Sequence, residues 1–336
     1  MHFAILGAGS WGTAIALQLV NAGHRATLVA RRYEHALEMG AQRENADYLP
    51  GFTLPTDLQL ACEVAPSVME AEVVFLACPV KGLAAALQQL AAARPSAWRL
   101  QLVLTLCKGL DPESLRRPGE LVAEALPGLA HGTLSGPSAA EEVAGGKPCA
   151  VVLAVEGGEP VRSLVDQVQE ILSEGRMRVY RSEDLTGVEL GGALKNPYAI
   201  GAGICDGLDV GDSAKASYLT RVMAEMQRVG TALGGKAETF TGLAGIGDLI
   251  ATAHGGWSRN RGFGEALARG KHVDELLSDR RSVVEGYPAI KAFHERCARL
   301  GVDAPILEQL YAICYEGRPA PTALDFLMKR PLKGEH

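Results

Sequence analysis

The feature of this sequence that most constrains its fold is a glycine-rich turn near the N-terminus. Gly7-Ala8-Gly9-Ser10-Trp11-Gly12 follows the apolar run Phe3–Leu6 directly and opens a helical pattern that extends to Ala22. Gly7 permits the tight turn, Gly9 lets the backbone approach a pyrophosphate, and Gly12 lets the helix pack closely on the strand. The helix N-terminus offers unpaired N–H groups and a favourable dipole to an anion. We therefore predict a dinucleotide-binding site; the alternative is a glycine-rich turn that binds no ligand.

Short apolar runs alternate with helical patterns through the first half of the chain. Each run is continuously apolar, which is typical of parallel strands covered on both faces. Strands that alternate with helices indicate a doubly wound α/β domain. We predict buried strands at Phe3–Leu6, Thr27–Ala30, Val73–Ala77, Leu100–Leu106, Gly132–Leu134 and Ala150–Val155. We predict helices at Gly12–Ala22, Gly82–Ala92, Gly119–Leu126 and Pro160–Leu172, with Pro118 and Pro160 at first helical positions and Gly23 as a C-terminal cap.

The pattern changes near Thr186, where clear strand runs stop. The remaining sequence predicts helices at Ala214–Leu233, Glu285–Leu300 and Pro305–Tyr315, and glycines cluster between them. A chain of 336 residues is long enough for two domains. We therefore predict an N-terminal Rossmann-type doubly wound sheet over residues 1–187 and a mainly α-helical, substrate-binding C-terminal domain over residues 188–336.

Composition and cysteine spacing narrow the class of protein. The net charge of −6 does not favour a nucleic-acid partner. The seven cysteines are widely spaced and include no C-x-x-C pair, which argues against a disulfide framework or a zinc site and favours a reducing compartment. The N-terminus lacks the features of a signal peptide, and no uncharged apolar run reaches the ~20 residues of a membrane helix. We expect a cytoplasmic protein without a membrane span or a metal.

The end of the second predicted strand bears on the choice of dinucleotide. A site specific for NAD usually carries Asp or Glu about 20 residues after the glycines, where it bonds the ribose 2′-hydroxyl. This chain has Arg31-Arg32 there and no acid before Glu34. A guanidinium is planar and always charged, which suits a 2′-phosphate. We predict that NADPH is preferred and that NAD(H) is also accepted; the alternative is a solvated basic pair.

Polar residues at predicted strand ends and in one apolar segment are candidates for the chemistry. Lys108 follows the strand Leu100–Leu106, and Ser138 lies just past Gly132–Leu134. In open α/β sheets the ligand binds beyond the carboxyl ends of the strands. Lys195 lies in an apolar, glycine-rich segment that we place at the domain junction, and burial there would lower its pKa towards neutrality. A general acid–base lysine needs that property; the alternative is a structural lysine in a salt bridge.

The segment Ser258-Arg259-Asn260 places a hydroxyl, a guanidinium and an amide close together. These donors suit phosphate binding. The alternative is a polar cap at the start of a helix.

Taken in order along the chain, these and further segments resemble one family. The segments run from Gly7–Ala14 through Lys108–Leu110, Ser135–Ser138, Gly191–Asn196, Gly242–Leu249 and Ser258–Arg261 to Val284–Gly286. The chain resembles the bacterial NAD(P)-dependent glycerol-3-phosphate dehydrogenases. The resemblance implies reversible reduction of dihydroxyacetone phosphate to sn-glycerol 3-phosphate with NAD(P)H. The product would supply glycerol phosphate for phospholipid synthesis.

The resemblance also implies roles for individual residues. Lys195 would be the proton acceptor in the oxidative direction, Asp248 would orient it, and Lys108 would lie between cofactor and substrate. Implied cofactor contacts, with the three glycines of the turn, are Ser10, Trp11, Arg31, Arg32, Tyr48, Lys108, Ala140, Arg259, Val283 and Glu285. Implied substrate contacts are Lys108, Gly136, Ser138, Lys195, Asp248, Ser258, Arg259 and Asn260.

The chain departs from the family pattern at Ala139, Pro197 and Gly262, where the family often has an aromatic, an aliphatic and an arginine residue. Proline inside a helix removes a hydrogen bond and can kink the chain, so Pro197 bears on the position of Lys195.

Two other interpretations remain open at this point. The first is a β-hydroxyacid-type dehydrogenase for another 2-oxo or 3-oxo substrate, with or without a phosphate; the second is a non-catalytic nicotinamide-binding redox sensor. A homodimer is expected because helical second domains often pair.

Overall fold

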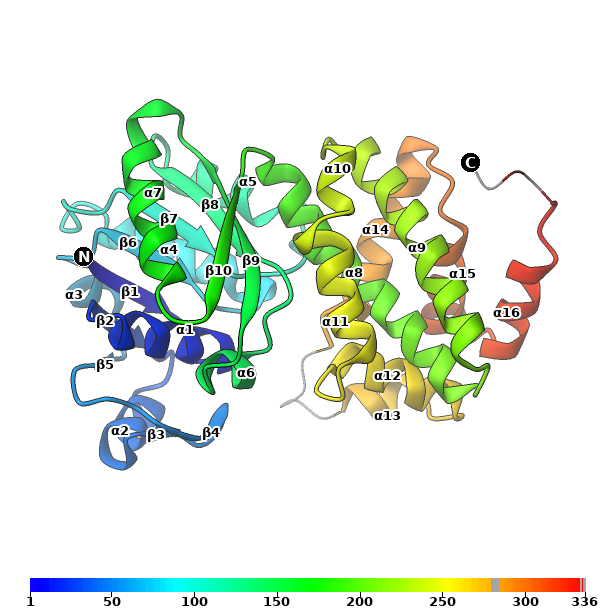
Figure 1. Ribbon diagram of the computed structural model, residues 1–336, viewed down its shortest axis with the longest axis horizontal. Coiled ribbons are helices and arrows are strands. Elements are labelled where there is room, and N and C mark those ends of the chain that lie inside the picture. Colours follow the sequence, from blue (N-terminus) through cyan, green and yellow to red (C-terminus); the bar gives the residue numbers. More distant parts are fainter. Residues whose placement is uncertain (279–283, 333, 335–336) are drawn as a thin grey trace. The chain divides into compact units, whose positions relative to one another are not determined.

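The computed structural model describes residues 1–278, 284–332 and 334 of the chain. It divides into two compact units, Met1–Glu189 and Leu190–His336 (Figure 1). Helix α8, Leu185–Gly207, contains the division between them. The boundary proposed from the sequence, between residues 187 and 188, falls in this same helix.

The first unit is built on an eight-stranded sheet with strand order β10-β9-β8-β7-β6-β1-β2-β5. Neighbouring strands are parallel throughout, except that β8 and β9 are antiparallel. The strands are β1 His2–Leu6, β2 Arg25–Val29, β5 Gln59–Ala61, β6 Val73–Leu76, β7 Leu102–Thr105, β8 Ala130–Ser135, β9 Cys149–Glu156 and β10 Met177–Ser182. The Rossmann-type fold predicted from the sequence is thus confirmed.

The sequence-based prediction was wrong about the direction of one strand pair. The run at Ala150–Val155 was expected to be parallel to its neighbours, but β9 pairs antiparallel with β8 and parallel with β10. A continuously apolar run reports burial on both faces and carries no information about direction. The edge strands β5 and β10 were not predicted; β10 alternates buried and exposed residues at its start, so it lacks a continuous apolar run.

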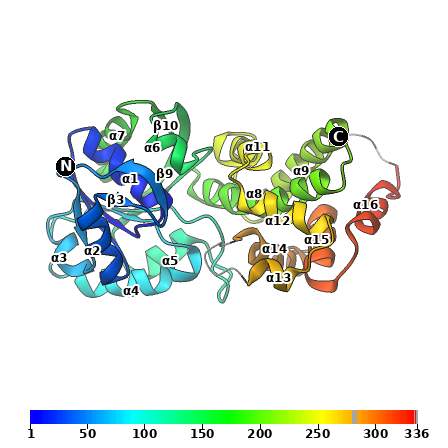
Figure 2. The same cartoon turned by 90° about the horizontal axis from the view of Figure 1, so that it is seen from below.

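Helices cover both faces of this sheet (Figure 2). Apolar side chains of α1 Ser10–Asn21, α6 Ala140–Ala144 and α7 Glu159–Ser173 pack on one face. Those of α3 Val64–Val68, α4 Leu83–Ala93 and α5 Pro118–Ala125 pack on the other, where the turn η1 Val80–Gly82 precedes α4. Helix α2 Tyr33–Gln42 and the hairpin of β3 Glu44–Asn45 and β4 Leu49–Thr53 follow β2. Burying a large aliphatic side chain such as Ile15 contributes about 1.5–3 kcal/mol to stability.

The ends of two helices follow the predicted signals. Pro118 is the first residue of α5, where its missing N–H costs nothing. Gly23 lies just past α1 with a φ of +79°, a left-handed conformation that glycine adopts without strain.

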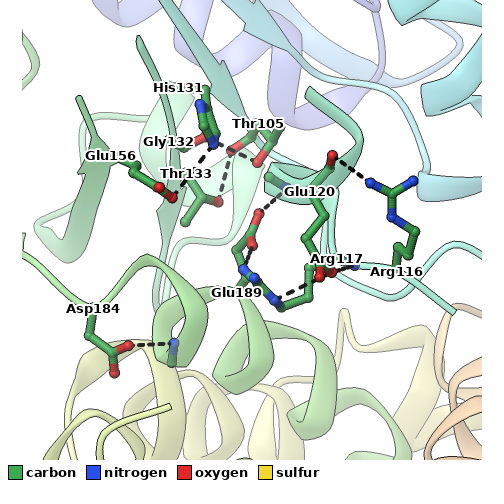
Figure 3. A network of polar contacts seen from close by, with 12 residues as sticks. Thr105, Arg116, Arg117, Glu120, His131, Gly132, Thr133, Glu156, Asp184 and Glu189 are labelled. Carbon is green, nitrogen blue, oxygen red and sulfur yellow. Dashed lines mark hydrogen bonds and ion pairs between the residues drawn. The ribbon is translucent and has the colours of Figure 1, made fainter. Parts of the chain in front are cut away.

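A buried carboxylate links helices α8 and α5 within the first unit. Glu189 on α8 accepts hydrogen bonds from Arg117 Nη1 at 2.7 Å and from the Gly119 backbone N–H at 2.6 Å (Figure 3). The Gly119 N–H lies in the first turn of α5, where backbone donors lack helical partners. Burial raises the pKa of Glu189 to about 7, against the opposing effect of the Arg117 charge.

The second unit is helical over its described residues. Its elements after α8 are α9 Asp212–Ala232, α10 Ala237–Phe240, the π-helical turn η2 Leu243–Gly247, α11 Asp248–His254, α12 Arg259–Ala268, α13 Val273–Leu277, α14 Gly286–Leu300, α15 Pro305–Glu316 and α16 Ala320–Met328. The mainly α-helical C-terminal domain predicted from the sequence is confirmed. No described helix combines the length and apolar content that a membrane crossing requires.

Helix α8 is the least predictable element of the chain. Its residues are buried on nearly all sides, so it shows no amphipathic period by which a helix could be predicted. The glycines of the segment that we placed at the domain junction, Gly191 and Gly192, lie inside it. At Gly203 an added Cβ would overlap the Arg261 carbonyl, and at Gly264 it would overlap that of Ile200. Glycine therefore lets the backbones of α8 and α12 approach closely.

Pro197 lies inside α8, and the helix continues through it to Gly207. The proline leaves Ala193 without the usual hydrogen-bond donor four residues on. It does not end the helix that carries Lys195.

A second buried carboxylate stabilises this unit. Glu225 on α9 accepts hydrogen bonds from Tyr198 Oη at 3.1 Å and from the backbone N–H groups of Ile306 at 2.8 Å and Leu307 at 2.9 Å. The two backbone donors lie in the first turn of α15. Burial raises the pKa of Glu225 to about 7, and the hydrogen bonds oppose that shift.

Candidate active site

The glycine-rich turn has the geometry that its sequence requires. Gly7 has a φ of +123°, and a Cβ added there would lie 2.6 Å from the Ala77 carbonyl oxygen. A Cβ added at Gly12 would overlap the Gly7 carbonyl oxygen. A Cβ added at Gly9 would meet no atom within 4 Å. Two glycines are thus required for packing, whereas the third faces open space.

The N-terminus of α1 fits a pyrophosphate. Its N-cap, Gly9, offers no side chain to the first backbone N–H groups, and its first turn carries no acidic residue. Donors that protein side chains leave without a cap, beside open space, are what an anion needs. The residues present therefore fit a dinucleotide, which Gly9, Ser10 and Trp11 would contact.

Asn45 is an important residue of this region that the sequence analysis did not single out. Its Nδ2 donates to the Ala8 carbonyl at 3.0 Å and to Thr13 Oγ1 at 2.8 Å. His35 Nε2 lies 3.0 Å from Asn45 Oδ1. Asn45 is fully buried, so these bonds hold the backbone of the turn in place. The only sequence signal was its position three residues before Tyr48, a predicted cofactor contact.

Tyr48 and Ser10, both predicted to contact the cofactor, are joined to each other. Ser10 Oγ donates to the Tyr48 carbonyl oxygen at 2.5 Å. The Tyr48 side chain itself is exposed.

The two arginines after β2 differ in their surroundings. Arg32 forms an ion pair with Asp47 at 3.3 Å and is the N-cap of α2. Arg31 is exposed and has no hydrogen-bond or ion-pair partner among the described residues. Arg31 is therefore the better candidate for a 2′-phosphate, because no carboxylate has to be displaced from it.

Lys108 and Ser138 meet at one carbonyl group. Lys108 Nζ donates to the Gly136 carbonyl oxygen at 3.1 Å, and Ser138 Oγ donates to the same oxygen at 3.1 Å. Gly136 has a φ of +136°, and an added Cβ would lie 3.0 Å from Val151 Cα. The structure thus brings together three residues predicted to border the substrate. Ala140 begins α6 shortly after them.

Lys195 lies in a closed polar centre in the second unit. It is only 6% exposed, and its Nζ donates to Asp248 Oδ1 at 3.0 Å and to Thr252 Oγ1 at 2.8 Å. Asp248 begins α11, where the helix dipole favours a carboxylate. The predicted burial of Lys195 and its pairing with Asp248 are both present. An ion pair is compatible with the acid–base role and with the structural one.

Thr252 is a second residue that the sequence analysis missed. It stands four residues after Asp248, so the two side chains share one face of α11. Given Asp248 as a candidate, this spacing of four residues could have predicted Thr252 as its neighbour.

Asn196, next to Lys195, takes part in a chain of amide contacts. Asn260 Nδ2 donates to Asn196 Oδ1 at 2.9 Å, and Asn260 Oδ1 accepts from the Gly286 N–H at 3.0 Å. Asn196 Nδ2 lies 3.5 Å from Glu285 Oε2. These contacts link α8, α12 and the start of α14. Asn260 therefore has a structural role, whatever it contributes to substrate binding.

The other residues of the segment Ser258–Arg261 make different contacts. Ser258 caps α12, since its Oγ accepts from the Arg261 N–H at 3.2 Å. Arg261 pairs with Asp206 at 2.8 Å and with Glu265 at 3.1 Å. Arg259 is exposed and has no partner among the described residues, so its guanidinium is available to a ligand. Val283, predicted to contact the cofactor, lies outside the described residues.

The remaining departures from the family pattern, at Gly262 and Ala139, lie in or next to regular helices. A Cβ at Gly262 would meet nothing within 4 Å, so a side chain can begin there without a clash. Ala139 is the N-cap of α6. Among the described residues, no three His, Cys, Asp or Glu side chains are grouped as metal ligands would be.

Comparison with known proteins places these features in one family. Residues 2–159 match the model of the N-terminus of NAD-dependent glycerol-3-phosphate dehydrogenase, and residues 184–325 match that of its C-terminus. A glycerol-3-phosphate dehydrogenase [NAD(P)+] of Thiobacillus denitrificans is 43% identical over 336 residues, which is 100% of both chains. One of Nitrosomonas europaea is 43% identical over 331 residues, which is 98% of each chain.

A solved structure agrees with this result. The crystal structure of the glycerol-3-phosphate dehydrogenase of Coxiella burnetii is 34% identical, with a TM-score of 0.91 over 98% of this chain and 99% of that one. Both family models, the full-length relatives and the fold therefore point the same way, and the chain belongs to the NAD-dependent glycerol-3-phosphate dehydrogenase family.

Proposed function

We propose that this protein reduces dihydroxyacetone phosphate to sn-glycerol 3-phosphate, reversibly, and so supplies phospholipid synthesis. NADPH is the preferred donor, and NADH is also accepted. The chain belongs to this family, and the observation that carries the proposal is the buried ammonium of Lys195, which contacts Asp248 and Thr252. An ammonium held in this way can give a proton to an oxygen that becomes negatively charged.

Lys195 acts as the general acid in the reductive direction. As the carbonyl of the substrate is reduced, its oxygen gains negative charge, and Lys195 stabilises that charge and supplies the proton. Asp248 keeps the side chain oriented and, until the proton leaves, compensates the buried charge. In the oxidative direction the neutral amine accepts the proton from the C2 hydroxyl.

The first unit holds the cofactor, which when bound supplies a hydride to C2 of the substrate. The N–H groups at the start of α1 bind its pyrophosphate, and the Arg31 guanidinium binds the 2′-phosphate of NADPH. Lys108, Gly136 and Ser138 border the substrate.

Arg259 binds the phosphate of the substrate and so fixes C2 in position. Its guanidinium is exposed and has no partner in the part of the chain that the structure describes, which supports that role, and Asn260 assists through its remaining amide hydrogen. Ser258 contributes by capping the helix that presents Arg259.

The proposed cellular setting is the cytoplasm, and the proposed assembly is a homodimer. The free state of all seven cysteines suits a reducing compartment. Light scattering after gel filtration measures the assembly directly, and a mass of one chain would exclude the dimer.

The deciding experiment is the steady-state rate of NADPH oxidation with dihydroxyacetone phosphate, run beside a panel of 2-oxo and 3-oxo acids. We expect dihydroxyacetone phosphate to have the highest kcat/KM. A higher value for an oxo acid would favour a β-hydroxyacid-type dehydrogenase. Saturable cofactor binding without turnover on any substrate would favour a redox sensor.

A further inference from the structure

Two cysteines lie side by side at the carboxyl edge of the sheet in the first unit. Strands β6 and β7 are parallel, and Leu76 is in register with Thr105. Their pairing continues past the strand ends, because the Leu106 N–H donates to the Leu76 carbonyl oxygen at 2.9 Å. Two residues further along each chain are Cys78 and Cys107, which the register places opposite each other.

The two side chains also point to the same face of the sheet. Cys78 and Cys107 belong to the apolar cluster that includes Leu76, whereas Ala77 and Leu106 belong to the cluster on the other face. This is the alternation expected of extended chains. Cys107 Sγ lies 3.0 Å from the Cys78 carbonyl oxygen, to which it donates. The thiols are therefore neighbours.

The backbone geometry suits a disulfide. Neighbouring strands lie about 4.7–4.9 Å apart, and disulfides join Cα atoms that are usually about 4.4–6.8 Å apart. We therefore expect bond formation to need a rotation of the thiols and little movement of the strands.

The two thiols differ in the way a reactive pair requires. Cys78 is partly exposed, whereas Cys107 is buried. A side-chain hydrogen bond between the two thiols lowers the pKa of Cys78, against the opposing effect of burial. Burial instead raises the pKa of Cys149, Cys205, Cys297 and Cys314. Thiolate character combined with access favours oxidation, and a nearby second thiol favours closure to a disulfide.

We propose that Cys78 and Cys107 are a redox-modification site, oxidised by hydroperoxides to a disulfide that reversibly lowers turnover. The Cys78 thiolate attacks one peroxide oxygen, the O–O bond breaks, and the leaving oxygen takes up a proton. The Cys107 sulfur then attacks the sulfur of the Cys78 sulfenic acid, and the S–O bond breaks with loss of water. Two thiols are oxidised to one disulfide and one hydroperoxide is reduced; a dithiol reverses the reaction.

The effect on turnover passes through Lys108, which follows Cys107 directly in the chain. The disulfide draws Cys107 Sγ away from the Cys78 carbonyl oxygen and shifts the adjoining peptide. Lys108 Nζ, now held by the Gly136 carbonyl oxygen, moves with it. This consequence rests on the proposed role of Lys108, whereas formation of the disulfide does not.

The test exposes the reduced full-length protein to hydrogen peroxide and follows thiols and activity separately. Mass spectrometry after alkylation is expected to show the loss of two hydrogen atoms and a cross-linked peptide pair containing Cys78 and Cys107. Turnover of dihydroxyacetone phosphate is expected to fall on the order of tenfold, because small misplacements of a catalytic group have large effects. Dithiothreitol is expected to restore it.

Variants separate the pair from the other thiols. Cys107→Ser is expected to stop at a Cys78 sulfenic acid, which dimedone labels, and Cys78→Ser is expected to resist inactivation by peroxide. The controls Cys62→Ser and Cys149→Ser, both partly exposed outside the pair, are expected to respond as the wild type does.

Three results would overturn the proposal: a cross-link between other cysteines, inactivation of Cys78→Ser at the wild-type rate, or a Cys78–Cys107 disulfide without loss of turnover. The peptide map of the wild type decides the first even where a variant fails to fold. Absence of turnover in the reduced wild type would instead count against the proposed function, and the mass readout would still test the disulfide.

Discussion

The glycine-rich turn of the first unit and the lysine centre of the second are built by opposite means. The turn uses backbone and open space: Gly9 has no atom within 4 Å of an added Cβ, and Arg31 is exposed. The lysine centre uses buried side chains that contact one another, as Lys195 does with Asp248 and Thr252. A site of the first kind is sensitive to added atoms, and one of the second kind to removed ones.

The largest expected effect follows from removing the buried ammonium. Lys195→Ala is expected to lower kcat on the order of 10²–10⁴-fold, because the proton donor is lost. Fluorescence titration is expected to give a wild-type Kd for NADPH. The matched control is Lys215→Ala, which removes the lysine–aspartate pair with Asp206 in the same unit and is expected to leave kcat within about twofold. Wild-type turnover by Lys195→Ala would make Lys195 a structural lysine.

The next largest effect is expected from substitutions that add one methyl group at either of two glycines in the turn. In Gly12→Ala the new Cβ would overlap the Gly7 carbonyl oxygen. We expect a loss of about 1–3 kcal/mol in the free energy of unfolding, together with weak NADPH binding. Gly9→Ala meets no protein atom, so urea unfolding is expected to give stability within about 0.5 kcal/mol of the wild type. Its Kd for NADPH is nevertheless expected to rise, and a wild-type Kd would show that this space is not the cofactor's.

A smaller effect separates the two arginines. Arg31→Ala is expected to raise the Kd for NADPH by about 10-fold or more, as loss of a charged hydrogen bond does, and to leave that for NADH nearly unchanged. Arg32→Ala, whose guanidinium pairs with Asp47, is expected to change the NADPH value less. Isothermal titration with both nucleotides measures these values. Equal losses for NADPH and NADH in Arg31→Ala would remove it from recognition of the 2′-phosphate.

The last comparison is between the buried carboxylates that cap a helix in each unit. Burial raises the pKa of Glu189 and of Glu225 from 4.5 to about 7. A raised folded-state pKa means that the folded protein binds more protons between these two values. The contribution to stability is therefore complete below about pH 4.5 and is lost as the pH rises through about 7, by roughly 1–3 kcal/mol per group.

Urea unfolding at a series of pH values between 5 and 8 measures this slope. Glu225→Gln, which cannot ionise, is expected to have a shallower slope than the wild type, and so is Glu189→Gln. An unchanged slope in Glu225→Gln would show that Glu225 is ionised throughout this range.

Features that depend on local backbone geometry and on residue order could be predicted from the amino-acid sequence. The turn Gly7–Gly12 could be predicted because Gly7 and Gly12 are required for steric reasons and Gly9 leaves space open, and these three nearby positions already express the pattern. The helix boundaries at Pro118 and Gly23 follow from φ preferences of the same local kind. The ordered motifs from Gly7 to Gly286 predicted the family, because each motif needs only neighbouring residues to be recognised.

Contacts between side chains that are distant in the sequence became known from the folded chain alone. The helix α8 has no amphipathic period, because it is buried on nearly all sides. The reason for its glycine at position 203 is the close approach of the α12 backbone, which the sequence does not show. Asn45 and Thr252 gained their importance from partners that folding brings to them. The opposed direction of β8 and β9, and the adjacency of Cys78 and Cys107, likewise depend on strand order, since contacts between strands are set by the whole sheet and not by any one segment.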